Sequence, residues 1–221
     1  MNLSSQDKIY STAKIAIMVD LLAEEGIPAE RALAGVFLSS EQLRSPATRV
    51  SVAQVLQSCR NAIRLSRNSQ LAYHASSKFR VSTYGIYGLI ALSSPNFREA
   101  IAFATAYHQL ATPLVQIDFR EEERTAAWIV TSLPYLETDG PLYEFIIKLQ
   151  MGAFLSLRRK MMGAAFKPAQ VDYALVQPHS EGDETVFFDC PVRHGQPENR
   201  FARPACSDIR RAKRSANRSQ S

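Results

Sequence analysis

The stretch VQIDFREEERTAAWIVT, residues 115–131, decides the fold class, because the spacing of its apolar side chains differs from that of the chain before it. Two series with a period of two residues flank a charged turn at residues 120–124. They are Val115, Ile117 and Phe119 before the turn, and Ala127, Ile129 and Thr131 after it. A period of two on both sides of a short polar turn is typical of a β-hairpin.

The chain before this stretch has helical spacing. Apolar residues recur at i, i+3, i+4 and i+7 from Ile15 to Leu22, and Gly26 is expected to end that helix. Ser51 and Gln54 have the spacing of a capping box, which marks the start of a second helix. Cys59 lies in the apolar stripe of this helix, so we interpret it as a core residue rather than a reactive thiol.

A short helix, a long helix and two further strands complete the expected elements. Thr83 to Leu92 predicts a short buried helix, whose two glycines allow close backbone approach. A long helix is expected from Pro141 to a stop at Gly163, and residues 171–176 and 185–188 predict strands. The predicted fold is α+β: a helix-rich first half, then a small antiparallel sheet packed on a long helix.

The net charge of +5 belongs to the C-terminal end of the chain. From residue 201 onward there are six basic residues and one acidic residue, so residues 1–200 carry twenty of each sign. A basic face, the usual footprint of a DNA-binding domain, is therefore not expected on the body. Residues 202–221 have Ile209 as their only large aliphatic side chain, which predicts disorder.

The sequence carries no enzyme or cofactor signature. It lacks a phosphate-binding glycine loop, a nucleophile elbow and an HExxH motif. Cys190 and His194 lack two further ligands at zinc spacing, so we interpret their segment as an exposed loop. The three cysteines are scattered, the N-terminus is polar, and no apolar run approaches the ~18 residues of a membrane span. These features predict a cytoplasmic, non-catalytic protein with no metal, cofactor or membrane partner.

Three tyrosines and two arginines are candidate ligand contacts. Tyr84, Tyr87 and Tyr107 lie around the apolar helix, where they either line a cavity for a small polar or amphiphilic ligand or pack in the core with their hydroxyls at the surface. Arg80 and Arg98 flank this region. Each is either the partner of a ligand carboxylate, which a guanidinium binds with two parallel hydrogen bonds, or a solvated surface residue.

His108 and Trp128 also have two interpretations each. His108 ends an apolar helix face, so it is either a haem or ligand contact or a hydrogen-bonded histidine at a helix end. Trp128 is the only tryptophan, and it forms either part of a pocket wall or part of the core.

Three segments resemble a known family through their order and spacing. They are residues 34–39 with 49–56, residues 85–100 with 107–113, and residues 191–200. Together they resemble the N-terminal, arabinose-binding-like effector domain of AraC-type transcription regulators, in the subgroup that includes ornithine-utilisation regulators. The similarity covers residues 12–200.

The resemblance implies an effector-sensing and dimerisation domain over residues 1–200, followed by a basic tail over residues 201–221. Such a domain binds a small-molecule effector, often forms a homodimer, and precedes two helix-turn-helix units that bind a promoter. After Phe201 this chain departs from the apolar stretch of similar proteins. We interpret it as truncated by a reading-frame shift before the DNA-binding domain, and expect no specific DNA binding by it alone.

Two other functions stay open at this point. One is a haem or gas sensor with His108 as the axial ligand. The other is a non-specific nucleic-acid binder that uses the basic tail, with an affinity that falls steeply as salt rises.

Overall fold

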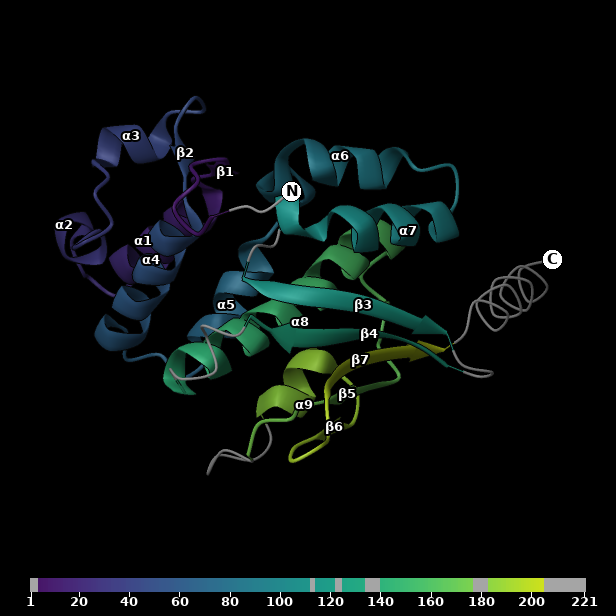
Figure 1. The fold of residues 1–221 in the computed structure, drawn as a ribbon. Helices are drawn as coiled ribbons and strands as arrows, with labels where there is room; N and C mark the ends of the chain where they lie inside the picture. The colour runs from purple at the N-terminus through teal and green to yellow at the C-terminus, as the bar shows by residue number, and fades with distance from the viewer. Residues whose placement is uncertain (1–3, 112–113, 122–124, 134–139, 177–182, 205–221) are drawn as a thin grey trace.

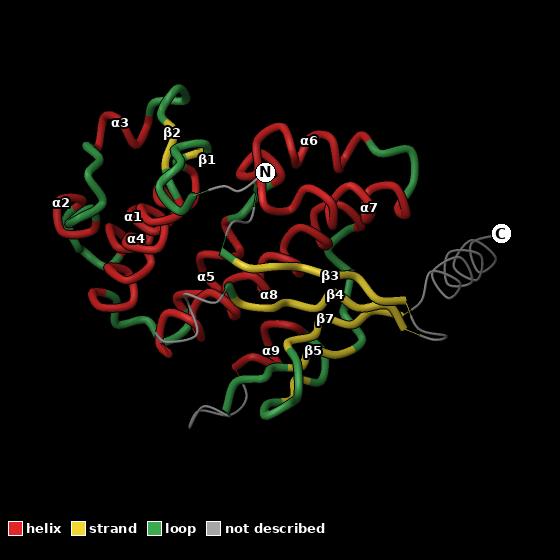
Figure 2. Tube along the Cα trace, in the orientation of Figure 1, coloured by secondary structure: helices red, strands yellow, loops and turns green. Residues whose placement is uncertain are grey.

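Most of the helices precede the five-stranded sheet along the chain, and Figure 2 distinguishes the helices from the strands by colour. The computed structural model describes residues 4–111, 114–121, 125–133, 140–176 and 183–204. The α-helices in these ranges are α1 (Ala13–Glu24), α2 (Ala29–Ala32), α3 (Ser40–Arg44), α4 (Val52–Leu65), α5 (Leu71–Lys78), α6 (Gly85–Ser93), α7 (Phe97–Tyr107), α8 (Gly140–Met162) and α9 (Asp183–Phe188). The strands are β1 (Tyr10–Ser11), β2 (Arg49–Val50), β3 (Val115–Glu121), β4 (Thr125–Ser132), β5 (Gln170–Asp172), β6 (Val192–Arg193) and β7 (Asn199–Pro204). Two 3-10 helices, η1 (Val81–Tyr84) and η2 (His108–Leu110), precede α6 and follow α7.

The elements β1 to α4 form an N-terminal lobe (residues 10–65), seen on one side of the molecule in Figure 1. The predicted capping box starts α4: the Ser51 hydroxyl accepts a hydrogen bond from the Gln54 amide at 3.3 Å, and Gln54 Oε1 accepts one from the Ser51 amide at 3.1 Å. Gly26, with φ +77°, follows the end of α1. Cys59 is buried in the core, and burial raises the pKa of its thiol to about 12, which confirms the core interpretation.

The second half of the fold is a five-stranded sheet with α8 along one face (Figure 1). The strand order is β3-β4-β7-β5-β6, and every neighbouring pair is antiparallel except β5 and β6. Phe154 of α8 stacks on Trp128 of β4, with ring centroids 5.5 Å apart, and lies 5.6 Å from the ring of Phe201. The predicted α+β fold, with the sheet on the long helix, is confirmed, and the parallel pair at one edge is an addition to it.

No helix in the described ranges has the length and hydropathy that crossing a bilayer requires.

Helix α6 lies at the surface, so the prediction of a buried helix is wrong. Gly88 faces η1 so closely that a Cβ there would lie 2.3 Å from the carbonyl oxygen of Val81. The side chains of Ile86, Leu89 and Ile90 lie at i, i+3 and i+4 and are exposed. The helix is apolar all round, but only the Gly88 side packs closely, and this leaves an apolar stripe uncovered.

Residues 185–188 belong to helix α9, so the predicted strand is wrong. Its aromatic rings explain the difference. Phe187 and Phe188 both lie against Tyr73 of α5, with centroid distances of 4.7 and 5.6 Å, and Glu184 accepts a hydrogen bond from the Tyr73 hydroxyl. In a strand, adjacent residues point to opposite faces, whereas a helix brings positions i, i+3 and i+4 to one face.

Strand β7 includes residues 202–204, for which the sequence predicts disorder. It pairs with β4 on one side and with β5 on the other, so backbone hydrogen bonds hold it in place without large aliphatic side chains. Arg203 is buried in this strand, with its guanidinium carbon 5.7 Å from the ring centroid of Phe119. The prediction of disorder is wrong for these three residues, and residues 205–221 lie outside the described ranges.

A Gly152→Ala substitution should destabilise the fold, because α8 and α5 approach most closely there. An ideal Cβ at Gly152 would lie 2.1 Å from the Oγ and 2.8 Å from the Cβ of the buried Ser76. We expect the free energy of unfolding to fall by roughly 1–3 kcal/mol in urea denaturation. Gly140→Ala in the same helix has nothing within 4 Å and serves as the control. An equal effect of both substitutions would contradict this packing.

Candidate functional site

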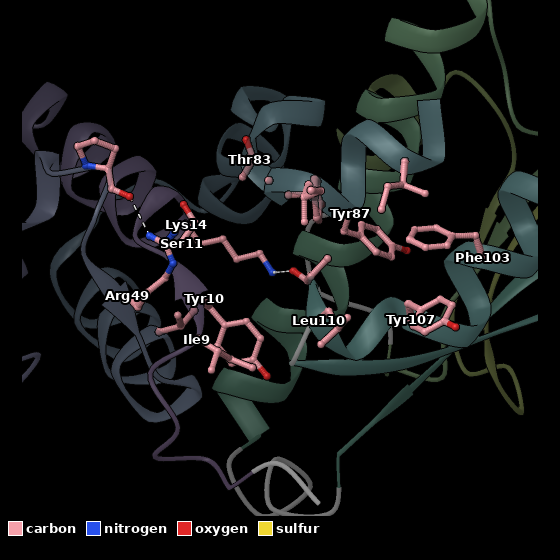
Figure 3. A pocket seen from close by; sticks show the side chains of 17 residues that line it. Ile9, Tyr10, Ser11, Lys14, Arg49, Thr83, Tyr87, Phe103, Tyr107 and Leu110 are labelled. Atoms are coloured by element: carbon pink, nitrogen blue, oxygen red, sulfur yellow. Dashed lines mark hydrogen bonds between the residues drawn. The ribbon is translucent and has the colours of Figure 1, made fainter. Parts of the chain in front are cut away.

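A cavity of about 600 Å³ lies between the N-terminal lobe and the α6–α7 hairpin (residues 85–107), as Figure 3 shows. The lobe contributes Tyr10, Lys14 and Arg49 to its wall, and the hairpin contributes apolar and aromatic side chains such as Ile90 and Phe103. Two parts of the fold that lie far apart in the sequence therefore meet at this site.

Aromatic rings form the hairpin side of the cavity. Successive ring centroids from Tyr84 to Tyr87, Phe103 and Tyr107 are 6.4, 5.3 and 5.1 Å apart. Gly85 adopts φ +56°, a conformation that glycine reaches without strain, and so permits the turn from η1 into α6. The Tyr87 hydroxyl donates a hydrogen bond to the Ala104 carbonyl at 3.2 Å, which ties α6 to α7. The ring row is thus fixed by the packing of the hairpin.

Lys14 extends from α1 across the space between the two parts (Figure 3). Its side chain is buried, and its Nζ donates a hydrogen bond to the Ala111 carbonyl oxygen at 2.8 Å. Nζ also lies 5.6 Å from the ring centroid of Tyr84. Burial disfavours the charged form and lowers the pKa of Lys14 to about 8. The charged form of Lys14 therefore still predominates at pH 7. Its described partners, the Ala111 carbonyl oxygen and the Tyr84 ring, carry no charge.

Arg49 is the second cation of the cavity wall, on β2 at the exposed rim. Its Nη1 donates hydrogen bonds to the carbonyl oxygens of Pro46 and Thr48 at 2.8 and 3.1 Å. The described residues that line the cavity include no Asp or Glu. The cavity therefore favours negative charge, although residues 1–200 are neutral overall.

The structure brings together only part of the residue set suggested by the sequence. Tyr84, Tyr87 and Tyr107 line the cavity, whereas His108 and Trp128 do not. His108 is buried, with its Nδ1 3.0 Å from the Thr105 carbonyl oxygen. Trp128 lies in the core between the sheet and α8.

The two predicted arginines also lie outside the cavity wall. Arg98 is exposed and has Glu121 at 3.5 Å as an ion-pair partner. Arg80 is exposed at the start of η1, where its backbone amide donates to the Thr83 hydroxyl. The cations that line the cavity are instead Lys14 and Arg49.

Sequence inspection missed Lys14, although a signal exists. Lys14 lies four residues before Met18 and seven before Leu21, both of which are buried, so it shares the buried side of α1. A lysine in phase with an apolar stripe is unusual, because burying an ammonium is costly. Arg49 carries no comparable signal, since an exposed arginine is common.

A second group of buried polar side chains surrounds Glu184 of α9. Its carboxylate accepts hydrogen bonds from the Tyr73 hydroxyl at 2.8 Å and pairs with Lys148 Nζ at 3.0 Å and His194 Nε2 at 2.6 Å. The His194 side chain is only 10% exposed, so the prediction of an exposed loop is wrong there. These contacts join α5, α8 and α9, and we assign them a structural role.

A family model described as the arabinose-binding domain of AraC transcription regulators, N-terminal, matches residues 26–206. The chain belongs to this family. The match extends past Phe201 and includes all of β7.

Two individual proteins are similar to this chain. The chain is 24% identical over 199 residues to the ornithine utilization regulator of Pseudomonas aeruginosa, covering 90% of this chain and 58% of that protein. The fold is similar to the crystal structure of the transcriptional regulator CdpR from Pseudomonas aeruginosa, with a TM-score of 0.61 and 16% identity, over 92% of this chain and 56% of that one. This AraC-family chain thus spans somewhat more than half the length of each relative.

Replacing Lys14 by methionine should stabilise this AraC-family domain at pH 7. The folded-state pKa of about 8 lies below the ordinary value of 10.5, so the buried ammonium costs stability at pH values below about 8. We expect Lys14→Met to raise the free energy of unfolding by roughly 1 kcal/mol, net of the lost hydrogen bond to Ala111. The gain should shrink as pH rises from 8 through 10.5, since well above 10.5 wild-type Lys14 is neutral in both states.

Urea denaturation of both proteins across this pH range measures the difference. Lys167→Met, at an exposed lysine outside the cavity, is the control. A Lys14→Met gain that is constant with pH would contradict the assignment of the buried charge.

Proposed function

We propose that this domain is the sensing part of an AraC-type regulator and binds a small-molecule effector in the cavity between the N-terminal lobe and the α6–α7 hairpin. The observation that carries the proposal is the cavity itself, at about 600 Å³, with a row of aromatic rings on one side and the cations Lys14 and Arg49 on the other. Small-molecule sites commonly have volumes of about 300–1,000 Å³ and this kind of lining. The family description names a sugar-binding domain, and the curated relative is named for the use of ornithine.

The cavity also suggests how a signal would arise. Its walls come from two parts of the fold, and a ligand that contacts both favours the arrangement in which they are close. Helix α7 and η2 precede β3 in the chain, and both contact it. A displacement of the hairpin would therefore also displace this edge strand of the sheet. We propose that the effector acts through this shift, in a homodimeric regulator of the cytoplasm whose sensing domain is non-catalytic.

The same proposal assigns DNA binding to a region outside this domain. Its support is the balance of charge over residues 1–200, which carry as many acidic as basic side chains, so that the composition does not indicate a basic face for a phosphate backbone. The haem-sensing alternative lacks similar support, because His108 lines neither this cavity nor the described ones of about 80 and 330 Å³. The basic-tail alternative falls mainly on residues 205–221, outside the described ranges.

A thermal-shift screen tests the proposal. Amino acids, polyamines, short carboxylic acids and fatty acids form the panel, and a ligand at about 100 times its Kd should stabilise the folded state by about 2.7 kcal/mol. Ile90→Trp fills the cavity from the half-exposed face of α6 and should abolish the shift. Val186→Trp on α9, also exposed but outside the cavity, should preserve it. Equal shifts in both variants would contradict binding at this site.

A further inference from the structure

Lys14 offers the cavity an ammonium with unused hydrogen-bonding capacity. An ammonium has three N–H donors, and among the described residues Nζ has one acceptor, the Ala111 carbonyl oxygen at 2.8 Å. No described carboxylate lies within ion-pair distance of it. Its nearest ring, Tyr84, is neutral, since burial raises the pKa of that phenol. A buried charge without a counter-charge costs folding free energy, and an anionic ligand would supply the missing partner.

The rest of the wall sets the remaining chemistry of the ligand. Two of the 17 lining residues are cations, Lys14 and Arg49, and none is an acid. Away from the two cations the wall consists largely of aromatic and aliphatic side chains, and Ile86, Tyr107 and Leu110 are about half exposed or more. An apolar group lying on these side chains would remove them from water.

On the basis of the proposed function, we propose that the effector is a monocarboxylate with an apolar or aromatic body. Its carboxylate accepts hydrogen bonds from Lys14, and its body lies along the ring row of Tyr84, Tyr87, Phe103 and Tyr107. Ligands that carry ammonium groups, including diamino acids, find no acid in the described lining to pair with. The cavity therefore selects ligands by the sign of the charge on their head group.

A matched series of three compounds tests this selection. They share a phenylbutyl body and differ in the head group: 4-phenylbutyrate, its uncharged amide 4-phenylbutyramide, and the cation 4-phenylbutylamine. Isothermal titration at pH 7 should give an affinity for the carboxylate at least about tenfold above that for the amide, because hydrogen bonds to charged partners are the stronger ones. The amine should bind most weakly.

Lys14→Met should reduce the ratio of carboxylate to amide affinity to about one, because it removes the charge that distinguishes the two head groups. Lys14→Arg keeps the charge and should retain a preference for the carboxylate. Lys167→Met, at an exposed lysine outside the cavity, should leave all three affinities unchanged. Equal binding of acid and amide by the wild type, or an undiminished preference in Lys14→Met, would overturn the inference.

The pH dependence of the wild type provides a test that needs no variant. Burial lowers the pKa of Lys14 to about 8, so above that pH the free protein loses the ammonium while the ligand carboxylate stays charged. The affinity for 4-phenylbutyrate should fall by up to about tenfold per pH unit between 8 and 10, and that for the amide should stay constant. A carboxylate affinity that does not change over this range would also overturn the inference.

The other groups that face Lys14 keep their charge state in this window. The titratable and charged groups around it are Tyr10, Arg49, Cys59, Tyr84 and Tyr87. Burial raises the pKa values of Cys59 and Tyr87 to about 12 each, and those of Tyr10 and Tyr84 also lie above the ordinary value. The guanidinium of Arg49 stays protonated throughout.

Failure of the inference is separable from failure of the proposed function. If an amine or a neutral compound binds most tightly and Ile90→Trp abolishes that binding, the cavity is an effector site but the selection for a carboxylate is wrong. If neither the phenylbutyl series nor any compound of the broader panel binds, both are wrong.

Discussion

The rest of the structure depends on the packing of α8 between the sheet and the helical part of the chain. One side of this helix presents Phe154 to Trp128 and Phe201 of the sheet. On another side Gly152 lets α5 approach until Ser76 occupies the space of a side chain. This helix is buried on several sides at once, and the main cluster of buried apolar residues includes side chains of the N-terminal lobe, of α8 and of the sheet.

This central packing explains why the α6–α7 hairpin is exposed. The sheet face next to α8 is already covered, and α6 touches the rest of the fold chiefly through η1, where Gly88 lies against Val81. The apolar stripe on the other side of α6 is exposed, and two of its members, Ile86 and Ile90, line the cavity. An exposed apolar stripe of the fold therefore borders the cavity of about 600 Å³.

Charge is placed differently in the two buried polar groups of this domain. Around Glu184 the carboxylate faces Lys148 and His194 and accepts a hydrogen bond from Tyr73, so donors and acceptors are matched within the protein. Lys14 has only a backbone carbonyl and an aromatic ring as described partners. Matched networks are typical of structural sites, whereas an unmatched charge facing a cavity is typical of a binding site.

The sequence by itself determined the α+β class, the capped helix at Ser51, the β3–β4 hairpin and the family, because each depends on local periodicity or on the order of short segments. It also drew attention to Tyr84, Tyr87 and Tyr107. Only the tertiary structure decided that α6 is exposed, that residues 185–188 form a helix, and that Lys14 rather than Arg80 or Arg98 lies with the tyrosines. Lys14 and Tyr107 are 93 positions apart in the sequence, and no local pattern reports which side of α1 meets the hairpin. The position of α1 relative to the hairpin depends on how α8 packs against both halves of the chain. This packing joins residues far apart in the sequence, so the local spacing of apolar residues does not predict it.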